Sequence, residues 1–124
     1  MTALHIKRAY EPRAQADGCR ILVDRLWPRG LTKAPAAIDH WFKEVAPSTD
    51  LRRWFDHRAD RWAEFRKRYR AELDGEPQRA LLNELAAIAT AGPTTLLYSA
   101  RDERHNQAVV LAAVLRERLD VDGD

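Results

Sequence analysis

A short apolar run that ends in charge, proline and glycine constrains this chain more than any other stretch. Residues 21–23, Ile-Leu-Val, have strand length and strand composition, and they are apolar enough to be buried on both faces of a sheet. Asp24 and Arg25 then place opposite charges where that strand should end. Pro28 cannot donate a hydrogen bond to a strand ladder. The stretch therefore predicts a buried strand that leads into a constrained, charged loop.

Two further segments predict strands. Residues 94–100, Thr-Thr-Leu-Leu-Tyr-Ser-Ala, form a second buried run that ends in a short polar loop. Residues 4–10 alternate, with Leu4, Ile6 and Tyr10 on one face, and their polar opposite face favours an edge position. The short connection to the next strand leaves open whether the first two strands are parallel or antiparallel.

Between and after these strands, apolar residues recur at helical spacing. Residues 78–91 predict a helix that Gly92-Pro93 ends, and Ser48 is a suitable N-cap for a short helix. The other predicted helices are a segment from Ala34 to Pro47 with Ile38, Trp41, Phe42 and Val45 on one side, a helix over residues 60–73, and a last helix over residues 108–119.

These elements predict one α/β domain over residues 1–119, followed by an acidic, frayed tail over residues 120–124. We expect a small sheet of two to four mostly parallel strands with helices on both faces. No apolar run approaches the roughly 18 residues that span a bilayer, and the start lacks a signal-peptide pattern. Cys19 is the only cysteine, which excludes an internal disulfide and a thiolate metal cluster. We therefore expect a cytoplasmic protein without membrane contact.

The cations are mostly arginine, with 17 arginines and four lysines, although the formal net charge is only +2. Arginine suits bidentate recognition of phosphate or carboxylate. Genomic base composition is the favoured explanation of the overall arginine bias, but it says nothing about particular arginines. The small net charge argues against a strongly basic nucleic-acid-binding protein.

Polar residues gather where the two buried strands end. In open α/β sheets, ligands bind at the carboxyl ends of the strands, and the start of the last helix adds free N–H groups and a positive dipole end. If the strands are parallel neighbours, an anion site forms there. The alternative is that Arg25 pairs with a carboxylate and Asn106 only caps the helix. The candidate ligand-binding residues are Arg25, Arg29, Lys33, Ser99, Arg101 and Asn106.

Whether the chain is an enzyme stays open at this stage. Asp24 and His105 are the candidate proton carriers, His105 because histidine titrates near neutral pH. A solvated loop histidine is the alternative interpretation. The histidines and aspartates show no metal-ligand spacing, and no phosphate loop or dinucleotide glycine fingerprint is present, so we expect no metal and no cofactor.

Several blocks of this sequence resemble the YeaO-like family, a branch of a larger bacterial family of unknown function. The resemblance covers nearly the whole chain. It rests on Lys7-Arg-x-Tyr10, on residues 17–30 with the block Asp-Arg-Leu-Trp-Pro-Arg-Gly, on Pro47-Ser-Thr-x-Leu-Arg52 and on Leu96-Leu-Tyr-Ser-Ala100. The wider family has a Cys-His-Arg motif after its last strand, whereas the corresponding loop here reads Glu103-Arg-His-Asn106. The resemblance therefore implies a fold and no cysteine-based reaction.

The leading hypothesis is a protein that binds a small phosphorylated or carboxylated ligand, with a nucleotide as one candidate. A second hypothesis is a nucleic-acid-binding module, and a third is a protein-interaction domain without a catalytic pocket. The oligomeric state is left open. The second hypothesis uses arginines of the middle helices, namely Arg52, Arg53, Arg58, Arg61, Arg66 and Arg70.

Overall fold

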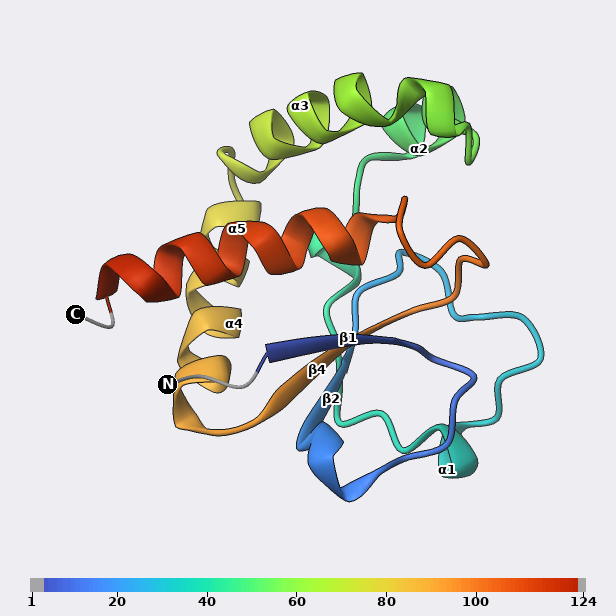
Figure 1. Cartoon of the computed structure of the whole chain (residues 1–124), viewed down its shortest axis with the longest axis vertical. Helices are drawn as coiled ribbons and strands as arrows, with labels where there is room; N and C mark the ends of the chain where they lie inside the picture. Colours follow the sequence, from blue (N-terminus) through green and yellow to red (C-terminus); the bar gives the residue numbers. More distant parts are fainter. Residues whose placement is uncertain (1–3, 123–124) are drawn as a thin grey trace.

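The computed structural model describes residues 4–122 and shows one four-stranded, fully parallel sheet (Figure 1). The strand order is β1-β4-β2-β3, so the last strand of the chain lies between the first two. This confirms the predicted α/β class and the edge position of the first strand, and it settles that strand's direction as parallel. The strands are β1 (Leu4–Arg8), β2 (Cys19–Leu22), β3 (His40–Trp41) and β4 (Thr94–Tyr98).

The helices follow the predicted pattern after residue 47. Ser48 caps α2, because its Oγ accepts the Leu51 N–H at 3.1 Å. The last helix continues through Asp122, and residues 123–124 of the predicted tail lie outside the described residues. The helices are α1 (Lys33–Ala36), α2 (Thr49–Phe55), α3 (Trp62–Leu73), α4 (Gln78–Ala91) and α5 (Gln107–Asp122), with short 3-10 turns at Gln15–Asp17, Lys43–Val45 and Ala59–Arg61.

The prediction of a helix between Ala34 and Pro47 was wrong. The only α-helical residues in that range are the last three of α1, a 3-10 turn follows at Lys43–Val45, and Ala37 ends α1 in the left-handed conformation at φ 49°. The chain then extends as β3, which pairs in parallel with Ile21 and Leu22 of β2. The open edge of β2 offers backbone hydrogen bonds that a short isolated helix cannot match. Tertiary pairing therefore overrides the helical spacing of the four apolar residues.

The two faces of the sheet carry different layers. Ile21 and Leu96 point into the main core, which α3, α4 and α5 cover, and α5 packs directly on β1 and β4 (Figure 1). Leu22 and Leu97 point the other way, into a smaller cluster with Leu31 from the loop before α1. Alternation along the strands thus gives the expected helices on both faces, with a thin layer on the side of α1.

Tyr10 does not extend the first strand as predicted. β1 ends at Arg8, and Tyr10 lies in the following turn with 42% of its surface exposed. Its hydroxyl donates to the carbonyl of Arg29 at 2.8 Å. The turn therefore packs against the charged loop that follows β2.

A charged network ties the start of β2 to the layer that contains α1. Arg20 is fully buried and donates to Asp17 Oδ2 at 2.6 Å and to the carbonyl of Ala36 at 2.9 Å. Lys7 reaches the same carboxylate at 3.1 Å. Burial alone would raise the pKa of Asp17, but hydrogen bonds from the Ala14 N–H and from both cations lower it to about 2. The ionised carboxylate is therefore the native form.

Asp17 makes the free energy of unfolding depend on pH. A carboxyl whose pKa falls from 3.8 to about 2 on folding adds about 2 kcal/mol of stability above pH 5, and this contribution is lost as the pH falls toward 2. Asp17→Asn should remove the contribution, so that its unfolding free energy changes less between pH 5 and 2 than that of the wild type. Urea denaturation at both pH values measures the difference. Glu84→Gln, on the exposed face of α4, is the control and should keep the wild-type slope.

Candidate functional site

A pocket lies where β2 and β4 end. The two strands are neighbours and parallel, yet the chain leaves β2 toward α1 on one face and leaves β4 toward α5 on the other. Such opposite exits open a crevice at the carboxyl edge of a parallel sheet. We call this cavity of about 360 Å³ the strand-end pocket; its lining residues are Asp24–Arg29, Ala46, Pro47, Arg52, Phe55, His57, Phe65, Ser99, Ala100 and His105–Gln107.

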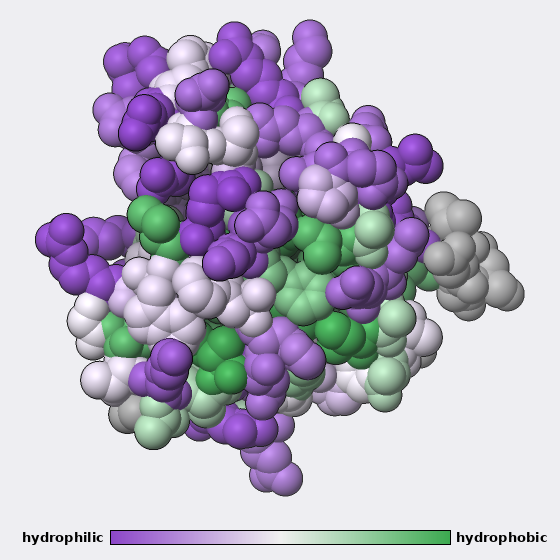
Figure 2. All heavy atoms as spheres, turned by 180° about the vertical axis from the view of Figure 1, so that it is seen from behind, coloured by the Kyte–Doolittle hydropathy of each residue, from purple (hydrophilic) through white to green (hydrophobic). Residues whose placement is uncertain are grey.

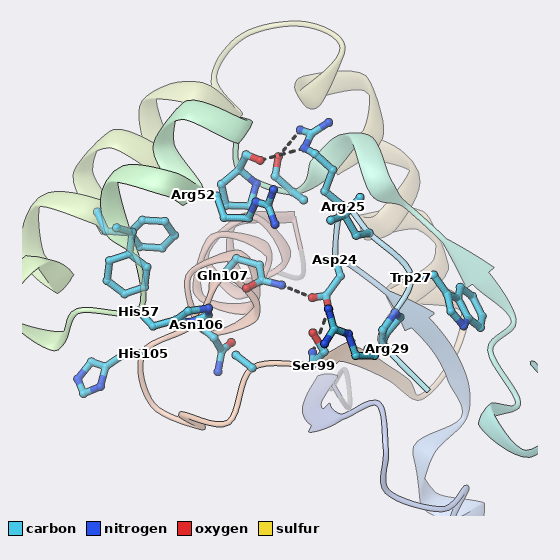
Figure 3. Close-up of a pocket in the computed structure, with 17 residues that line it drawn as sticks. Asp24, Arg25, Trp27, Arg29, Arg52, His57, Ser99, His105, Asn106 and Gln107 are labelled. Carbon is cyan, nitrogen blue, oxygen red and sulfur yellow. Dashed lines mark hydrogen bonds between the residues drawn. The ribbon is translucent and has the colours of Figure 1, made fainter. Parts of the chain in front are cut away.

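Asp24 forms the floor of the strand-end pocket (Figure 3). Its side chain is buried, one carboxylate oxygen accepts the Ser99 N–H at 3.0 Å, and the other accepts the amide of Gln107. The two predicted polar loops are thus joined through one carboxylate. Burial raises the pKa of Asp24 above its usual value, while the hydrogen bonds from Ser99 and Gln107 and the charge of Arg52 act in the opposite direction.

Two arginines hold the backbone around the pocket. Arg25 donates to the carbonyls of Pro47 at 3.1 Å and Ala46 at 3.0 Å, and it lies 3.7 Å from the carboxylate of Glu44. Arg8, at the end of β1, donates to the carbonyls of Ser99 and Ala100, both at 3.0 Å. Arg25 lines the pocket as predicted, but its guanidinium is committed to protein groups. Its ligand-binding role is therefore not supported by this geometry.

Arg29 and Arg52 are the uncommitted cations of the pocket. Arg29 comes from the loop after β2 and Arg52 from α2, and both side chains are exposed. Across residues 4–122, neither guanidinium has a hydrogen-bond or ion-pair partner, whereas that of Arg25 has several. In Figure 3, Asp24 and Gln107 lie between them. The pocket thus offers two free guanidinium groups on either side of its floor.

The start of α5 forms the next wall. Asn106 is buried, its Oδ1 accepts the Val109 N–H at 3.2 Å, and its amide donates to the carbonyl of Asp102 at 2.9 Å. It is therefore the N-cap of α5 as well as a lining residue. His105 also lines the pocket, and its Nδ1 lies 2.8 Å from the Asp102 carboxylate, which holds the ring in one orientation. The hydrogen bond from His105 lowers the pKa of Asp102.

Two phenylalanines form an aromatic part of the pocket lining. Phe55 and Phe65 stack with ring centroids 4.2 Å apart, and both line the strand-end pocket. His57 follows Phe55 in a turn where Asp56 and His57 both adopt positive φ, at 47° and 55°. Successive left-handed residues other than glycine are uncommon, and such backbone strain is found most often at functional sites. The turn places His57 in the lining of the pocket.

Not every predicted residue reaches the pocket. Lys33 is exposed and lines a second cavity of about 400 Å³, on the side of β3 with Trp27 and Trp41. Arg101 is exposed and is not among the lining residues. Ser99 lines the pocket and contributes its backbone N–H. The structure therefore brings Asp24, Arg25, Arg29, Ser99, His105 and Asn106 together and leaves two of the predicted cations outside.

Sequence reasoning did not assign three polar lining residues to this pocket: Arg52, His57 and Gln107. The signal for Arg52 was present, because it ends the Pro47–Arg52 block on which the family resemblance rests. Gln107 directly follows Asn106, the predicted N-cap. Extending the predicted site by one residue into the helix would have included Gln107. His57 depends on the left-handed turn, which nothing in the local sequence predicts.

Most arginines of the middle helices already have partners. Arg58, Arg68 and Arg70 pair with the carboxylates of Asp60, Glu64 and Glu117, respectively. Arg61 donates to the carbonyl of Trp54, whose ring Arg61 and Arg68 flank at 5.1 and 4.2 Å. Figure 2 shows hydrophilic residues over α2 and α3, at the top of the molecule, with acids among the bases in the sequence. This neutralised surface weakens the case for a nucleic-acid interface.

Two kinds of feature are absent from residues 4–122. No three side chains among histidine, cysteine, aspartate and glutamate come together in a way that would hold a metal ion. No helix in the same range is long and apolar enough to cross a bilayer.

Comparison with known proteins gives a consistent result over the whole chain. Residues 3–124 match the family DUF488-N3i, described as the inactive DUF488-N3 subclade. The chain is 50% identical over 113 residues to the uncharacterised protein YeaO of Escherichia coli K12, covering 91% of this chain and 96% of that protein. It is 38% identical over 117 residues to the uncharacterised proteins Mb3100c of Mycobacterium bovis and Rv3073c of Mycobacterium tuberculosis, covering 94% of this chain and 97% of each relative. No solved structure matches.

Proposed function

We propose that this chain, which belongs to the YeaO-like family DUF488-N3i, binds a small anionic molecule in the strand-end pocket. The observation that supports this most is a pair of guanidinium groups, Arg29 and Arg52, that line one pocket and have no partner among residues 4–122. Guanidinium forks match phosphate and carboxylate oxygens, and charged hydrogen bonds of this kind are the strong ones. The start of α5 adds a positive dipole end on a third side.

The rest of the pocket favours a ligand with a flat or apolar body. Phe55, Phe65 and Pro47 belong to the same lining as Arg29, so an aromatic or apolar group attached to the anion has a surface to contact. A nucleotide combines an anionic group with an aromatic base, so it remains one candidate. The matching family is described as an inactive subclade, and a protein that binds a ligand without converting it agrees with that description.

The test compares arginine variants in ligand binding. Arg29→Ala and Arg52→Ala should each weaken binding of a phosphorylated or carboxylated ligand by roughly 10- to 100-fold, because each removes a charged hydrogen bond. Isothermal titration with inorganic phosphate, adenosine monophosphate and citrate measures the affinities. Both side chains are exposed, so the free energy of unfolding of each unliganded variant should lie within about 0.5 kcal/mol of the wild-type value.

Arg79→Ala is the matched control, because Arg79 is an exposed arginine of α4 outside the pocket. Its affinities should equal those of the wild type. Wild-type affinity in both pocket variants would contradict the proposal. Binding to short DNA alone, with loss at high salt, would favour the nucleic-acid hypothesis instead.

A further inference from the structure

The floor of the strand-end pocket carries a charge that an anion would ordinarily avoid. Asp24 lines the pocket, and its carboxylate lies between Arg29 and Arg52 (Figure 3). An oxyanion held by these two arginines has Asp24 as its neighbour below. Two ionised oxygens in contact repel each other, whereas an O–H between them forms a short, strong hydrogen bond. The ligand therefore needs a proton at that contact.

From this geometry we infer that Asp24 makes the pocket selective for an oxyanion that still carries a proton, namely hydrogen phosphate or a phosphomonoester, over sulfate, carboxylates and phosphodiesters. The inference rests on the proposed function and specifies its ligand class. It makes Asp24 a specificity-determining residue of the site. Arg29 and Arg52 would supply attraction for any small anion, and Asp24 would decide which of them fits.

Asp24 is held in place for this role. The Ser99 N–H and the Gln107 amide each donate to a different oxygen of its carboxylate, and the Trp41 indole donates to its backbone carbonyl at 2.7 Å. Each carboxylate oxygen accepts about two hydrogen bonds, so each retains capacity for one more. The burial that raises the pKa of Asp24 also favours sharing a proton there.

The charged and titratable groups around Asp24 come from several elements. Arg25 and Arg29 belong to its own loop, Arg52 to α2, and the buried Tyr69 to α3. His57 and His105 line the same pocket. Protonation of either histidine would strengthen binding of every anion alike, sulfate included. A pH effect confined to ligands that carry a proton therefore reports on Asp24.

The experiment measures the affinities of inorganic phosphate, methyl phosphate, dimethyl phosphate and sulfate by isothermal titration at pH 6. The wild type should bind phosphate roughly 10- to 100-fold more tightly than sulfate or dimethyl phosphate, the effect of one charged hydrogen bond. Methyl phosphate distinguishes the two possible ligands, a phosphomonoester and free phosphate. Affinity equal to that of phosphate indicates a phosphomonoester, and a large loss indicates free phosphate.

Asp24→Asn should abolish the preference and bring phosphate and sulfate within about threefold of each other, because an amide can donate to an oxygen without a proton. The Gln107 amide can rotate so that its oxygen accepts from the new amide. Asp74→Asn, an exposed change beyond α3, should keep the wild-type preference. The thermal midpoints of both variants check that they are folded.

A second readout needs no variant. The complex retains the proton that the ligand carries, so it holds more protons than its separated components once the pH exceeds the second pKa of the phosphate, about 6 for a monoester. Affinity of the wild type for methyl phosphate should then fall about tenfold per pH unit between pH 7 and 9, beyond any change in sulfate binding.

The outcomes separate the two proposals. If none of the four anions binds, and adenosine monophosphate and citrate do not bind either, the proposed function fails and this inference fails with it. If phosphate and sulfate bind the wild type equally, only the selectivity attributed to Asp24 is overturned. The same holds if Asp24→Asn keeps the preference while folded, or if methyl phosphate and sulfate show the same pH dependence.

Discussion

Replacing Gly18 with alanine should destabilise the protein by more than about 4 kcal/mol, a large fraction of the total stability of a domain this size. Gly18 lies between the Asp17 turn and β2 with φ 62° and ψ −132°, a conformation almost confined to glycine. A Cβ there would stand 2.1 Å from the carbonyl oxygen of Pro93 and 2.6 Å from its carbon. Both are backbone atoms, so the strand start itself must move.

That movement would disturb the centre of the sheet. The carbonyl of Pro93 accepts the Cys19 N–H at 2.9 Å, directly before the paired residues of β2 and β4. Urea denaturation followed by tryptophan fluorescence should show Gly18→Ala unfolded or near its midpoint without denaturant. Gly30→Ala is the matched control, because Gly30 also has positive φ, at 77°, yet has open space at its Cβ position. It should lose only about 1 to 2 kcal/mol; equal losses in both variants would refute the steric argument.

Arg20→Met should cost about 3 to 5 kcal/mol, as expected when one partner of a buried charged network is removed. Arg20 is fully buried, and its guanidinium satisfies Asp17 together with the carbonyls of Ala36 and Glu11. Methionine fills much of the volume but leaves those acceptors without their donors. The measurement is the free energy of unfolding in urea at pH 7.

Two further variants test the cause of that loss. Arg20→Lys keeps the charge but lacks the planar fork that reaches three acceptors, so it should recover only part of the stability. Arg68→Ala removes an exposed ion pair with Glu64 and should cost less than about 1 kcal/mol. If Arg20→Met were as mild as Arg68→Ala, the buried network would not be a main source of stability.

The sequence predicted the elements that local signals define. The apolar run at residues 21–23, the buried strand after Pro93 and the α4 segment all occur where patterning and Gly-Pro punctuation place them. β3 was missed because its two residues form a strand only against the free edge of β2. That edge is a product of tertiary structure, and nothing in the spacing of Trp41 and its neighbours indicates it.

The candidate site was likewise predictable from the sequence only in part. Its location followed from the rule for strand ends, and Arg29 and Asn106 were named for it. Which arginine is free, however, depends on acceptors far away in the chain. Arg25 finds the carbonyls of Ala46 and Pro47, and Arg8 finds those of the loop after β4, whereas Arg52 finds none among the described residues. Long-range hydrogen bonding of this kind has no signature in a linear sequence.

The position of β4 has a consequence for how the chain matures on the ribosome. Nascent chains grow at about 5–20 residues per second, and β1 and β2 emerge long before the strand that must lie between them. Until residues 94–98 arrive, β1 has no neighbour in the sheet, and β2 has only the two-residue β3. Both strands keep open edges during most of synthesis, which is when edge-to-edge aggregation threatens. The four-stranded sheet therefore forms only after residues 94–98 have been synthesised, and a chain that stops before them lacks the strand that joins β1 to β2.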